Sequence, residues 1–532
     1  MIQMPSLSTP GAILLVACYE LGHQPLSLAA PLATLRRAGY APTAVDTSVT
    51  PLDDDDIRAA RLIAISVPMH TALRLGVRVA EHTRQLNPNA TLCFYGLYAT
   101  LNADYLLQSH ADAIIGGEYE EALLALAQSL EAPTSRAPQR RAAKATAKPA
   151  NTTPSPRPTR KQGATAPHAE LPPSHTYGKG AGGLGLPHIP GVRTREHAEA
   201  PVLARLPFAV PARETLPPPT EYAQLAWGDG RTTLAGYVEA SRGCLHTCLH
   251  CPITPVYGGR FFITPREVVL ADIREQVGMG ARHITFGDPD FLNGPKHSLA
   301  ILRAMRDEFP DVTFDATIKV EHILERRALM PELAALGCAF VVSAVESLSA
   351  NVLRHLAKGH TRADVAEALA VLDATGIPMR PTFVAFTPWT TADDYLDLLA
   401  FVAEHDLIDN IDPVQYSIRL LVPPGSALLG ADDVGDWLGP LDQAAFSYHW
   451  SHPDARMDAL QRAVAALVEA TARQSPAPSA DATFAAIRAL AEHTLGRSGA
   501  SADVAPSVME RLMALAPRTK GALPHLTESW FC

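Results

Sequence analysis

The sequence predicts an α/β protein of four parts and a tail: a doubly wound N-terminal domain, a disordered linker, a partial (β/α)6 barrel and a helical C-terminal region. Three observations predict this order. Apolar runs alternate with helical patterns at residues 1–130 and again at 205–429, as expected for parallel sheets covered by helices. Residues 131–204 between them are rich in Ala, Pro, Thr and basic side chains. Residues 430–516 show Ala- and Leu-rich helical periodicity, and the tail covers 517–532.

The N-terminal domain opens with the continuous apolar run Gly11–Cys18, which is typical of a parallel strand buried on both faces. Helices are expected at residues 26–38 and 118–130, with others between. The remaining strands are expected at residues 43–45, 62–67, 91–95 and 113–115. In a doubly wound domain, ligands bind at the carboxyl ends of the strands.

The linker of residues 131–204 combines many Arg and Lys residues with the Gly-rich stretch 178–185. Such a composition cannot bury enough apolar surface to order itself. We therefore expect a disordered, soluble tether. Binding of RNA or another polyanion by this basic arm stays open as an alternative.

The barrel region is expected to begin with the strand Leu234–Ala240. Five more strands, each reached through helical segments, are expected at residues 283–286, 312–317, 339–344, 379–386 and 414–421. One helix, between the third and fourth strands, is expected at residues 322–336. Active sites of such barrels lie at the carboxyl ends of the strands, so the loop after Ala240 lies on the active face.

Composition excludes several classes of protein. The 532 residues carry 45 basic and 55 acidic side chains, and the net charge of −10 argues against a general nucleic-acid-binding protein. No stretch approaches the roughly 18 apolar residues of a membrane helix, and the apolar run Ala12–Ala17 lacks the basic flank of a signal peptide. Seven cysteines, three of them in one loop, indicate metal binding inside the cell. We expect a cytoplasmic protein with neither membrane nor nucleic acid as partner.

Three cysteines, Cys244, Cys248 and Cys251, dominate the loop after the first barrel strand. A 4Fe–4S cube has four irons that each take a thiolate, so three closely spaced cysteines leave one iron free for another ligand. The next cysteine in the chain is the distant Cys338. A zinc site completed by a nearby histidine is the alternative, although zinc sites usually show paired CxxC units.

The pattern CxxxCxxC, with His250 before the third cysteine and Pro252 after it, resembles the radical S-adenosylmethionine (SAM) superfamily. The resemblance implies a 4Fe–4S cluster whose open iron binds the amino and carboxylate groups of SAM. One electron then splits SAM and yields a 5'-deoxyadenosyl radical that abstracts a hydrogen from the substrate. It also implies a reductant such as flavodoxin or ferredoxin and a small-molecule or peptide substrate of unknown identity.

The same resemblance implies residues that contact the cofactors. His250 is expected beside SAM, and Gly287-Asp288 stands where the family has a Gly-Gly-Glu-like motif that binds the amino group. A turn capped by Asp288 is the alternative. Glu346 and Ser347 resemble a Glu-Ser segment that approaches the ribose or methionyl groups. The nearby Lys319, Glu321 and His322 could contact a cofactor, or Lys319 could simply form a salt bridge with a glutamate.

The N-terminal domain resembles the cobalamin-binding domains that precede many radical SAM barrels. The matching segments are Ser66–Met69, Tyr95-Gly96 and Gly116–Glu120, each after an expected strand. The Asp-x-His-x-x-Gly motif, whose histidine ligates cobalt, is absent, and the corresponding loop reads Tyr19–His23. Cobalamin binding and a domain that kept the fold without this ligand both stay open.

A closer resemblance is to radical SAM proteins with a CUAEP or CCAEP tail. It is carried by segments such as Gly258–Phe261, Phe286–Asn293 and Arg419–Gly425. The chain stops at Cys532, where that tail would begin, so we expect a selenocysteine codon read as a stop. Cys532 would then be a catalytic redox thiol of the tail. A chance cysteine at an ordinary frayed terminus is the alternative.

We therefore expect a radical SAM enzyme of the cobalamin-domain type, whose reaction is methyl transfer or a radical rearrangement or oxidation. The alternative is a non-enzymatic cobalamin or iron–sulfur redox-sensing protein.

Overall fold

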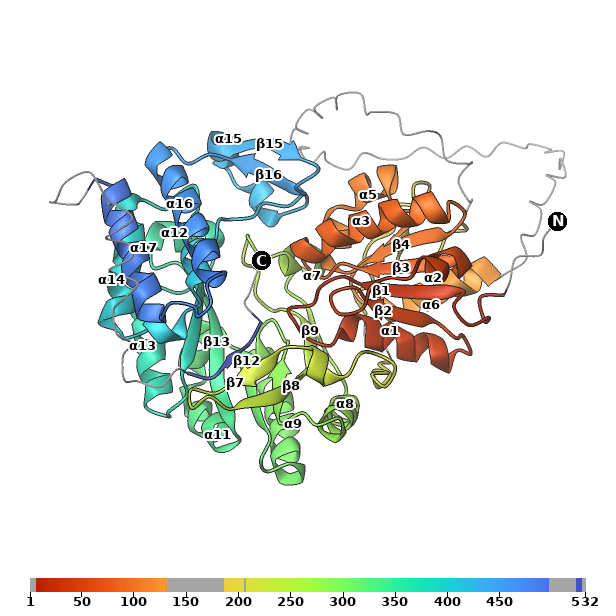
Figure 1. Cartoon of the computed structure of the whole chain (residues 1–532), viewed down its shortest axis with the longest axis horizontal. Helices are drawn as coiled ribbons and strands as arrows, with labels where there is room; N and C mark the ends of the chain where they lie inside the picture. Colours follow the sequence, from red (N-terminus) through yellow and green to blue (C-terminus); the bar gives the residue numbers. More distant parts are fainter. Residues whose placement is uncertain (1–5, 132–185, 205–206, 497–522, 529–532) are drawn as a thin grey trace, which may run out of the picture.

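The computed structural model describes residues 6–131, 186–204, 207–496 and 523–528. Two α/β units lie side by side, and the C-terminal helices and a hairpin lie above the second unit (Figure 1). No helix within these ranges combines the length and apolarity needed to cross a membrane.

The N-terminal unit is the doubly wound domain that the sequence predicts. Its sheet has the order β2-β1-β3-β4-β5-β6, and the first five strands are parallel. The strands are β1 (Ile13–Ala17), β2 (Thr43–Asp46), β3 (Leu62–Ser66), β4 (Thr91–Tyr95) and β5 (Ala113–Ile115). The helices are α1 (Leu26–Arg37), α2 (Asp54–Ala59), α3 (His70–Leu86), α4 (Leu97–Leu101), α5 (Ala103–Ser109) and α6 (Glu120–Glu131).

Part of the expected linker is ordered. Residues 132–185 lie outside the described ranges, but β6 (Val192–Arg193) extends the N-terminal sheet by pairing antiparallel with β5. Val202 N–H then donates to Gly116 O at 3.2 Å, and Glu118 N–H donates to Val202 O at 2.8 Å. The prediction of a disordered linker therefore does not hold for residues 186–204, because their backbone groups find partners at the sheet edge.

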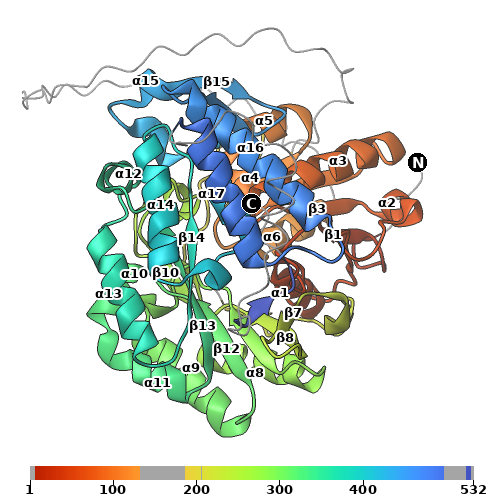
Figure 2. The same ribbon diagram turned by 60° about the vertical axis from the view of Figure 1, so that its left-hand side comes forward.

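The second unit is a curled half-barrel (Figure 2). Its sheet has the order β14-β13-β12-β11-β8-β7-β17. Five strands are parallel, namely β8 (Thr232–Val238), β11 (His283–Phe286), β12 (Thr313–Thr317), β13 (Cys338–Glu346) and β14 (Met379–Phe383). β7 (Gln224–Ala226) and β17 (His525–Leu526) add antiparallel at the β8 edge. The outer helices are α8 (Arg266–Gly278), α9 (Pro295–Glu308), α10 (Val320–Glu325), α11 (Met330–Ala335), α12 (Ala350–Leu356), α13 (Arg362–Asp373) and α14 (Ala392–Glu404).

Two predicted elements of the barrel differ. The sixth strand, expected at residues 414–421, is a 3-10 turn at Pro413–Tyr416 followed by one parallel bridge between Phe386 and Arg419. The single helix expected at 322–336 is split into α10 and α11 by a 3-10 turn at Arg327–Leu329. Pro331 lies in the first turn of α11. Proline is tolerated at a helix start but interrupts a helix interior, so a new helix begins here.

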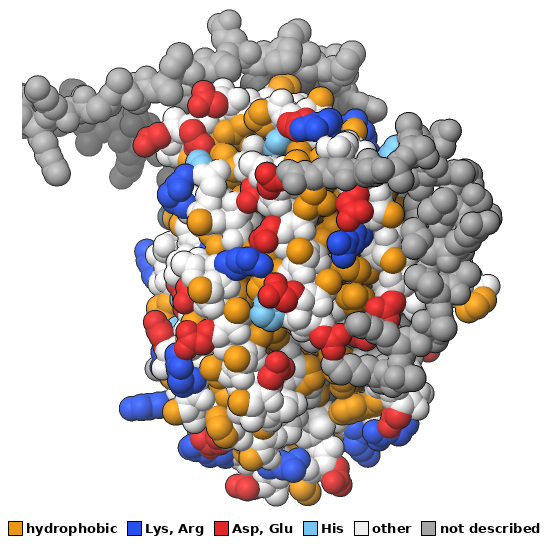
Figure 3. Space-filling model, turned by 90° about the vertical axis from the view of Figure 1, so that its left-hand side faces the viewer, with side chains coloured by type: hydrophobic (Ala, Val, Ile, Leu, Met, Phe, Trp, Pro, Cys, Tyr) orange, Lys and Arg blue, Asp and Glu red, His pale blue; other side chains and the backbone are white. Residues whose placement is uncertain are grey.

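The C-terminal region is helical, as predicted, but includes a hairpin. Helices α16 (Ala455–Ala472) and α17 (Ala480–Thr494) pack near α14, and acidic and basic side chains are interspersed on this face (Figure 3). Strands β15 (Leu438–Asp442) and β16 (Ser447–Trp450) form the hairpin. Phe446, between them, is buried in the core of the N-terminal unit. The hairpin therefore packs the C-terminal region against the N-terminal unit.

Candidate active site

A short hairpin holds the three cysteines at the mouth of the barrel. Strands β9 (Ser241–Gly243) and β10 (Phe261–Ile263) pair antiparallel, and Cys244 N–H donates to Arg260 O at 3.0 Å. Gly243 has a φ of 77°, and a Cβ there would lie 2.4 Å from Arg260 O, so this position requires glycine. Helix α7 (Ile253–Tyr257) begins just beyond Cys251. The cysteine loop is thus fixed at both ends.

The sulfur atoms of this loop suit a cluster better than a single ion. Cys244 and Cys248 are buried, and Cys251 is half-buried. A 4Fe–4S cube takes one thiolate on each of three irons and leaves the fourth iron open, which these three cysteines match. A structural zinc site takes four protein ligands, so this loop would need one more. The donor set therefore fits a 4Fe–4S cluster with one open iron.

These thiols need a metal to ionise. Burial raises the pKa of Cys251 to about 11 and raises the pKa of Cys244 as well. A coordinated metal deprotonates a thiol outright. Asn293 Nδ2 donates toward Cys244 Sγ at 3.7 Å, and contacts of this kind tune cluster potentials. Asn293 lies in the polar loop after the second barrel strand, but it was not among the residues predicted to contact a cofactor.

His250 and Glu346, both predicted to contact cofactors, lie together. His250 Nε2 is 3.2 Å from Glu346 Oε1, and Lys358 Nζ is 3.6 Å from the same oxygen. Burial raises the pKa of Glu346, but the charge of Lys358 and the hydrogen bond with His250 outweigh it and lower the pKa to about 2. Glu346 has a φ of 65°, a strained value for a non-glycine residue. His250 Nδ1 is buried without a hydrogen-bond partner, so it is available to a bound group.

Gly287 and Asp288 follow β11 and brace the chain that leads to the cysteines. A Cβ at Gly287 would lie 1.9 Å from the Tyr237 hydroxyl, so the aromatic ring requires glycine here. Asp288 Oδ1 accepts from Ser241 Oγ at 2.5 Å, and Oδ2 accepts from Ala240 N–H at 2.9 Å. Burial raises the pKa of Asp288 to about 7. Contact of Asp288 with the amino group of SAM stays a prediction.

The remaining residues selected from the sequence have local partners. Ser347 Oγ accepts from Ser349 N–H at 3.2 Å, which stabilises the turn after β13. Lys319 forms an ion pair with Glu321, the salt bridge that the sequence left open. A cofactor contact by Ser347 therefore remains a prediction.

A cavity of about 260 Å³ lies among the barrel strands. Polar side chains line it from β11, β12 and β14, namely Thr285, Asp315 and Arg380. The loop after β1 adds His23, whose ring lies 4.8 Å from the Tyr237 ring. Burial lowers the pKa of His23 to about 4, so the imidazole is neutral at pH 7. Both α/β units thus contribute to one cavity.

The C-terminal segment closes the cavity at the β7 edge. Thr527 N–H donates to Gln224 O at 2.8 Å, and Gln224 N–H donates to Thr527 Oγ1 at 2.9 Å. Glu528 lines the cavity and accepts from the Tyr19 hydroxyl at 3.1 Å. The predicted tail thiol Cys532 lies outside the described residues, so its role stays a prediction. Two-residue β17 carries no periodicity by which the sequence could have indicated this pairing.

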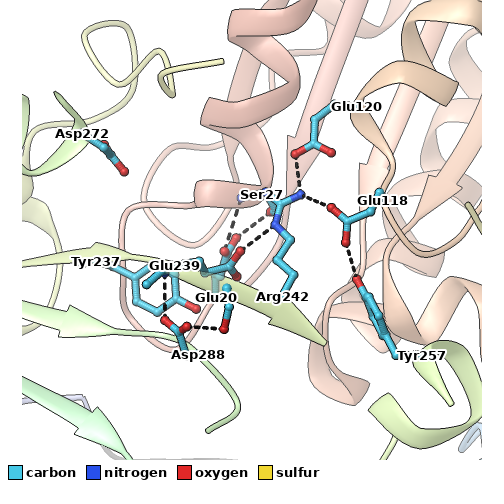
Figure 4. A network of polar contacts seen from close by, with 12 residues as sticks. Glu20, Ser27, Glu118, Glu120, Tyr237, Glu239, Arg242, Tyr257, Asp272 and Asp288 are labelled. Atoms are coloured by element: carbon cyan, nitrogen blue, oxygen red, sulfur yellow. Dashed lines mark hydrogen bonds and ion pairs between the residues drawn. The ribbon is translucent and has the colours of Figure 1, made fainter. Parts of the chain in front are cut away.

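Arg242, just before the cysteine loop, joins the two α/β units (Figure 4). Its Nη1 donates to Glu118 at 3.2 Å and to Glu120 at 2.6 Å, both in the N-terminal unit. Its Nε donates to Glu239 at 2.8 Å. The guanidinium also lies 5.2 Å from the Tyr119 ring, a cation–π contact. Gly116–Glu120, a segment that resembles cobalamin-binding domains, therefore holds the residue that precedes the cysteine loop.

Carboxylates outnumber cations at this junction. Burial raises the pKa of Glu20 to about 7, and burial also raises the pKa values of Glu118 and Glu239. Glu20 accepts from Ser27 Oγ at 2.6 Å. Of these carboxyls, Glu20 therefore exchanges its proton near neutral pH.

The carboxyl edge of the N-terminal sheet fits cobalamin in one respect. Ser66 Oγ is buried and has no partner that meets both the distance and the angle of a hydrogen bond, and the neighbouring Tyr95 hydroxyl donates to Ser27 O of α1 at 2.8 Å. An orphaned hydroxyl at a strand end suits a bound group. Gly117, in contrast, accommodates the chain itself, since a Cβ there would lie 2.2 Å from Val202 O. His23 lines the barrel cavity, so a histidine ligand to cobalt from this loop is not indicated.

Comparison with known proteins agrees with this geometry. Residues 238–402 match the family model of the radical SAM superfamily. An uncharacterized methyltransferase of Pyrococcus horikoshii is 25% identical over 189 residues, which cover 35% of this chain and 40% of the relative. A tRNA-2-methylthio-N(6)-dimethylallyladenosine synthase of Desulfosudis oleivorans is 27% identical over 206 residues, which cover 37% and 43%. The chain thus spans about two fifths of the length of these relatives.

Two solved structures share the architecture over most of the chain. OxsB, a cobalamin-dependent SAM radical enzyme solved with aqua-cobalamin, gives a TM-score of 0.63 at 14% identity, covering 91% of this chain and 71% of its own. TsrM, a radical SAM methyltransferase from Kitasatospora setae solved with cobalamin and a [4Fe-4S] cluster, gives 0.51 at 15% identity, covering 75% and 71%. Residues 238–402 therefore match the radical SAM superfamily, and the chain shares over most of its length the fold of these two solved structures.

Proposed function

We propose that this chain is an enzyme that cleaves SAM reductively at a 4Fe–4S cluster held by Cys244, Cys248 and Cys251. The observation that carries the proposal is a loop of three free cysteines, two of them buried, at the start of the segment that matches the radical SAM superfamily. When bound, the cluster supplies the electron that converts SAM to a 5'-deoxyadenosyl radical. A flavodoxin or ferredoxin would reduce it.

The chain's own residues position the reactants. His250, held by Glu346, presents its unpartnered Nδ1 next to the cluster loop, where the adenosyl part of SAM would lie. Asp288 fixes the backbone at Ala240 and lines the cavity, where it would accept a hydrogen bond from the amino group of SAM. The loop after β1 and β17 both line the cavity, and exclusion of water by such a wall would protect a radical from side reactions.

Cobalamin is the second cofactor that we propose, and residues at the carboxyl edge of the N-terminal sheet, Ser66 among them, would hold it. The orphaned Ser66 hydroxyl supports this placement, and OxsB and TsrM are described as binding cobalamin. We favour methyl transfer as the reaction, because the Pyrococcus relative and TsrM are described as methyltransferases. The polar lining formed by Thr285, Asp315 and Arg380 suits a substrate with several hydrogen-bonding groups.

Anaerobic reconstitution tests the proposal. The protein, loaded with iron and sulfide and given dithionite and SAM, should release 5'-deoxyadenosine, measured by mass spectrometry. Addition of cobalamin should give a protein-bound corrin spectrum after gel filtration, and Ser66→Ala should weaken this binding. A reconstituted protein with a full complement of iron that yields no 5'-deoxyadenosine would instead indicate the redox-sensor alternative.

A further inference from the structure

Three potential metal ligands meet beside the cysteine loop. His246 lies within that loop, Asp290 follows β11, and His322 lies in α10. Their donor atoms all lie within 4.8 Å of one another, and no other such group of three or more occurs in the described ranges. Asp290 and His322 are buried, and His246 is half-buried. Three distant parts of the sequence therefore present two imidazoles and one carboxylate to a single point.

The contact between His322 and Asp290 has the distance of a hydrogen bond without its geometry. His322 Nδ1 is 2.7 Å from Asp290 Oδ2, yet this buried nitrogen makes no hydrogen bond. A hydrogen bond would require Nδ1–H to donate and to point at the oxygen, in the plane of the ring. Two ligands of one ion at ~2.1 Å from each would instead lie roughly 3.0–3.4 Å apart, with the oxygen about 40° off that direction. His246 Nε2 forms a hydrogen bond with the same oxygen at 3.1 Å, a separation within this range, whereas the 2.7 Å contact of His322 would lengthen by a few tenths of an ångström around an ion.

Further contacts fix the ligands in the orientation that an ion requires. The Leu292 N–H donates to Asp290 Oδ1 at 3.2 Å, which leaves Oδ2 for the two histidines. Glu321 Oε2 lies 3.7 Å from His246 Nδ1. A carboxylate at that nitrogen would accept its proton and leave Nε2 free to bind metal, as in carboxylate–histidine–metal arrangements. In the ion-free protein, Lys319 Nζ lies 3.1 Å from His246 Nδ1, so binding would shift Lys319 fully to Glu321.

We propose that His246, Asp290 and His322 bind a divalent first-row transition-metal ion, separate from the cluster, with zinc as the ion of choice. Two imidazoles and one carboxylate form a borderline donor set, and three protein ligands leave a further position for water or a ligand. The ion would tie the loop between Cys244 and Cys248 to the ends of β11 and β12. No relative named above is described as holding such an ion.

Zinc-edge X-ray absorption on the wild-type protein tests the proposal without any variant. The cluster is reconstituted first, so that iron occupies the cysteines, and the protein is then dialysed against micromolar zinc sulfate. We expect one zinc per chain, with nitrogen and oxygen ligands at about 2.0–2.1 Å. A shell of sulfur at about 2.3 Å would place zinc on the cysteines and overturn the proposal. Absence of retained zinc would show that the three residues form a hydrogen-bonded clamp only, which also overturns it.

Variants sharpen the assignment. Zinc affinity, measured by equilibrium dialysis, should fall at least tenfold in His322→Gln and about 10–100-fold in Glu321→Gln, which removes only the partner of His246. His360→Gln is the matched control, since His360 is a buried histidine nearby that contacts Val345 O and not the three ligands. The triple alanine variant of Cys244, Cys248 and Cys251 should retain zinc. Loss of zinc in that variant, with retention in His322→Gln, would contradict the proposal.

Discussion

The two parallel sheets of this molecule bury different kinds of side chain. In the N-terminal sheet, every residue of β1, β3 and β4 is buried, and their sequences are almost entirely apolar. In the barrel sheet, β11 and β12 carry His283, Thr285 and Asp315. His283 Nε2 and Thr285 Oγ1 contact Asp315 at 2.8 and 2.7 Å. Buried polar groups cost stability unless they are paired, and the barrel sheet pairs its own with one another. The inner face of the barrel sheet therefore carries a polar site, whereas the N-terminal sheet forms an apolar core.

The open ends of the two sheets differ as well. The N-terminal sheet is covered at β5 by residues around Val202, which belong to its own chain extension. The barrel is covered by the loop after β1 and by β17, which line a cavity rather than fill it. The N-terminal unit therefore contributes to the barrel site, because its loop after β1 lines the barrel cavity. This contribution is at least as important as any binding site at the edge of its own sheet. Each prediction below tests one part of this difference.

The largest effect should come from the cysteine loop. Cys251→Ala removes one of three iron ligands, so 5'-deoxyadenosine formation should fall by more than ~1000-fold and bound iron should drop. Cys338→Ala is the control, because Cys338 is a cysteine in the same domain outside the loop. Iron content and product are measured on the same samples. Normal iron and product in Cys251→Ala would remove the loop from the site.

Arg213 tests how firmly the two units are joined. It is fully buried, and its guanidinium donates to Gln24 Oε1 of the N-terminal unit at 3.1 Å, to both carboxylate oxygens of Asp272 in the barrel unit, and to Tyr237 O at 2.7 Å. Arg213→Met leaves Asp272 as an uncompensated buried charge, so the free energy of unfolding in urea should fall by about 3–5 kcal/mol. The double variant Arg213→Met/Asp272→Leu should recover part of this loss. Equal instability of both variants would contradict the role of the unpaired charge.

Glu20 tests the protonated junction through pH. Its pKa of about 7 in the folded protein lies above the ordinary value of 4.5. The folded state therefore binds this proton more tightly, and the resulting stability is complete below about pH 4.5 and lost as the pH rises through about 7. In the wild-type protein this loss decreases the free energy of unfolding between pH 5 and 8. In Glu20→Gln the decrease should be smaller by roughly 1–3 kcal/mol. Glu404→Gln, at an exposed site on α14, should leave the fall unchanged. An unchanged fall in Glu20→Gln would contradict the prediction.

Thr527 tests whether β17 is a true edge strand of the barrel. Thr527→Pro removes the N–H that donates to Gln224 O, a bond of about 1 kcal/mol, so hydrogen exchange in β7 should rise about fivefold. Thr527→Val keeps this donor and loses only the hydroxyl contact, and it should show a smaller rise. Exchange that is unchanged in both variants would mean that β17 does not pair in solution.

Features local in sequence could be predicted, and features that join distant segments could not. Apolar runs indicated β1, β3 and β4, and the spacing of the cysteines indicated the cluster loop, because each signal lies within a few residues. The pairing of Arg242 with Glu118 joins positions 124 residues apart, and nothing near either residue encodes it. The expected sixth strand failed because an apolar run does not reveal whether its backbone groups find a strand partner. Within 414–421 the pairing is a single bridge, in which Ile418 O and Leu420 N–H bond to Phe386.

The most direct test of the central claim is electron paramagnetic resonance of the reduced, reconstituted protein with and without SAM. A cube held by three sulfur atoms has one iron that SAM can bind, so the cluster signal should shift when SAM is added. The wild-type protein should show this shift, and a signal that is identical with and without SAM, or a protein that assembles no cluster, would contradict the account.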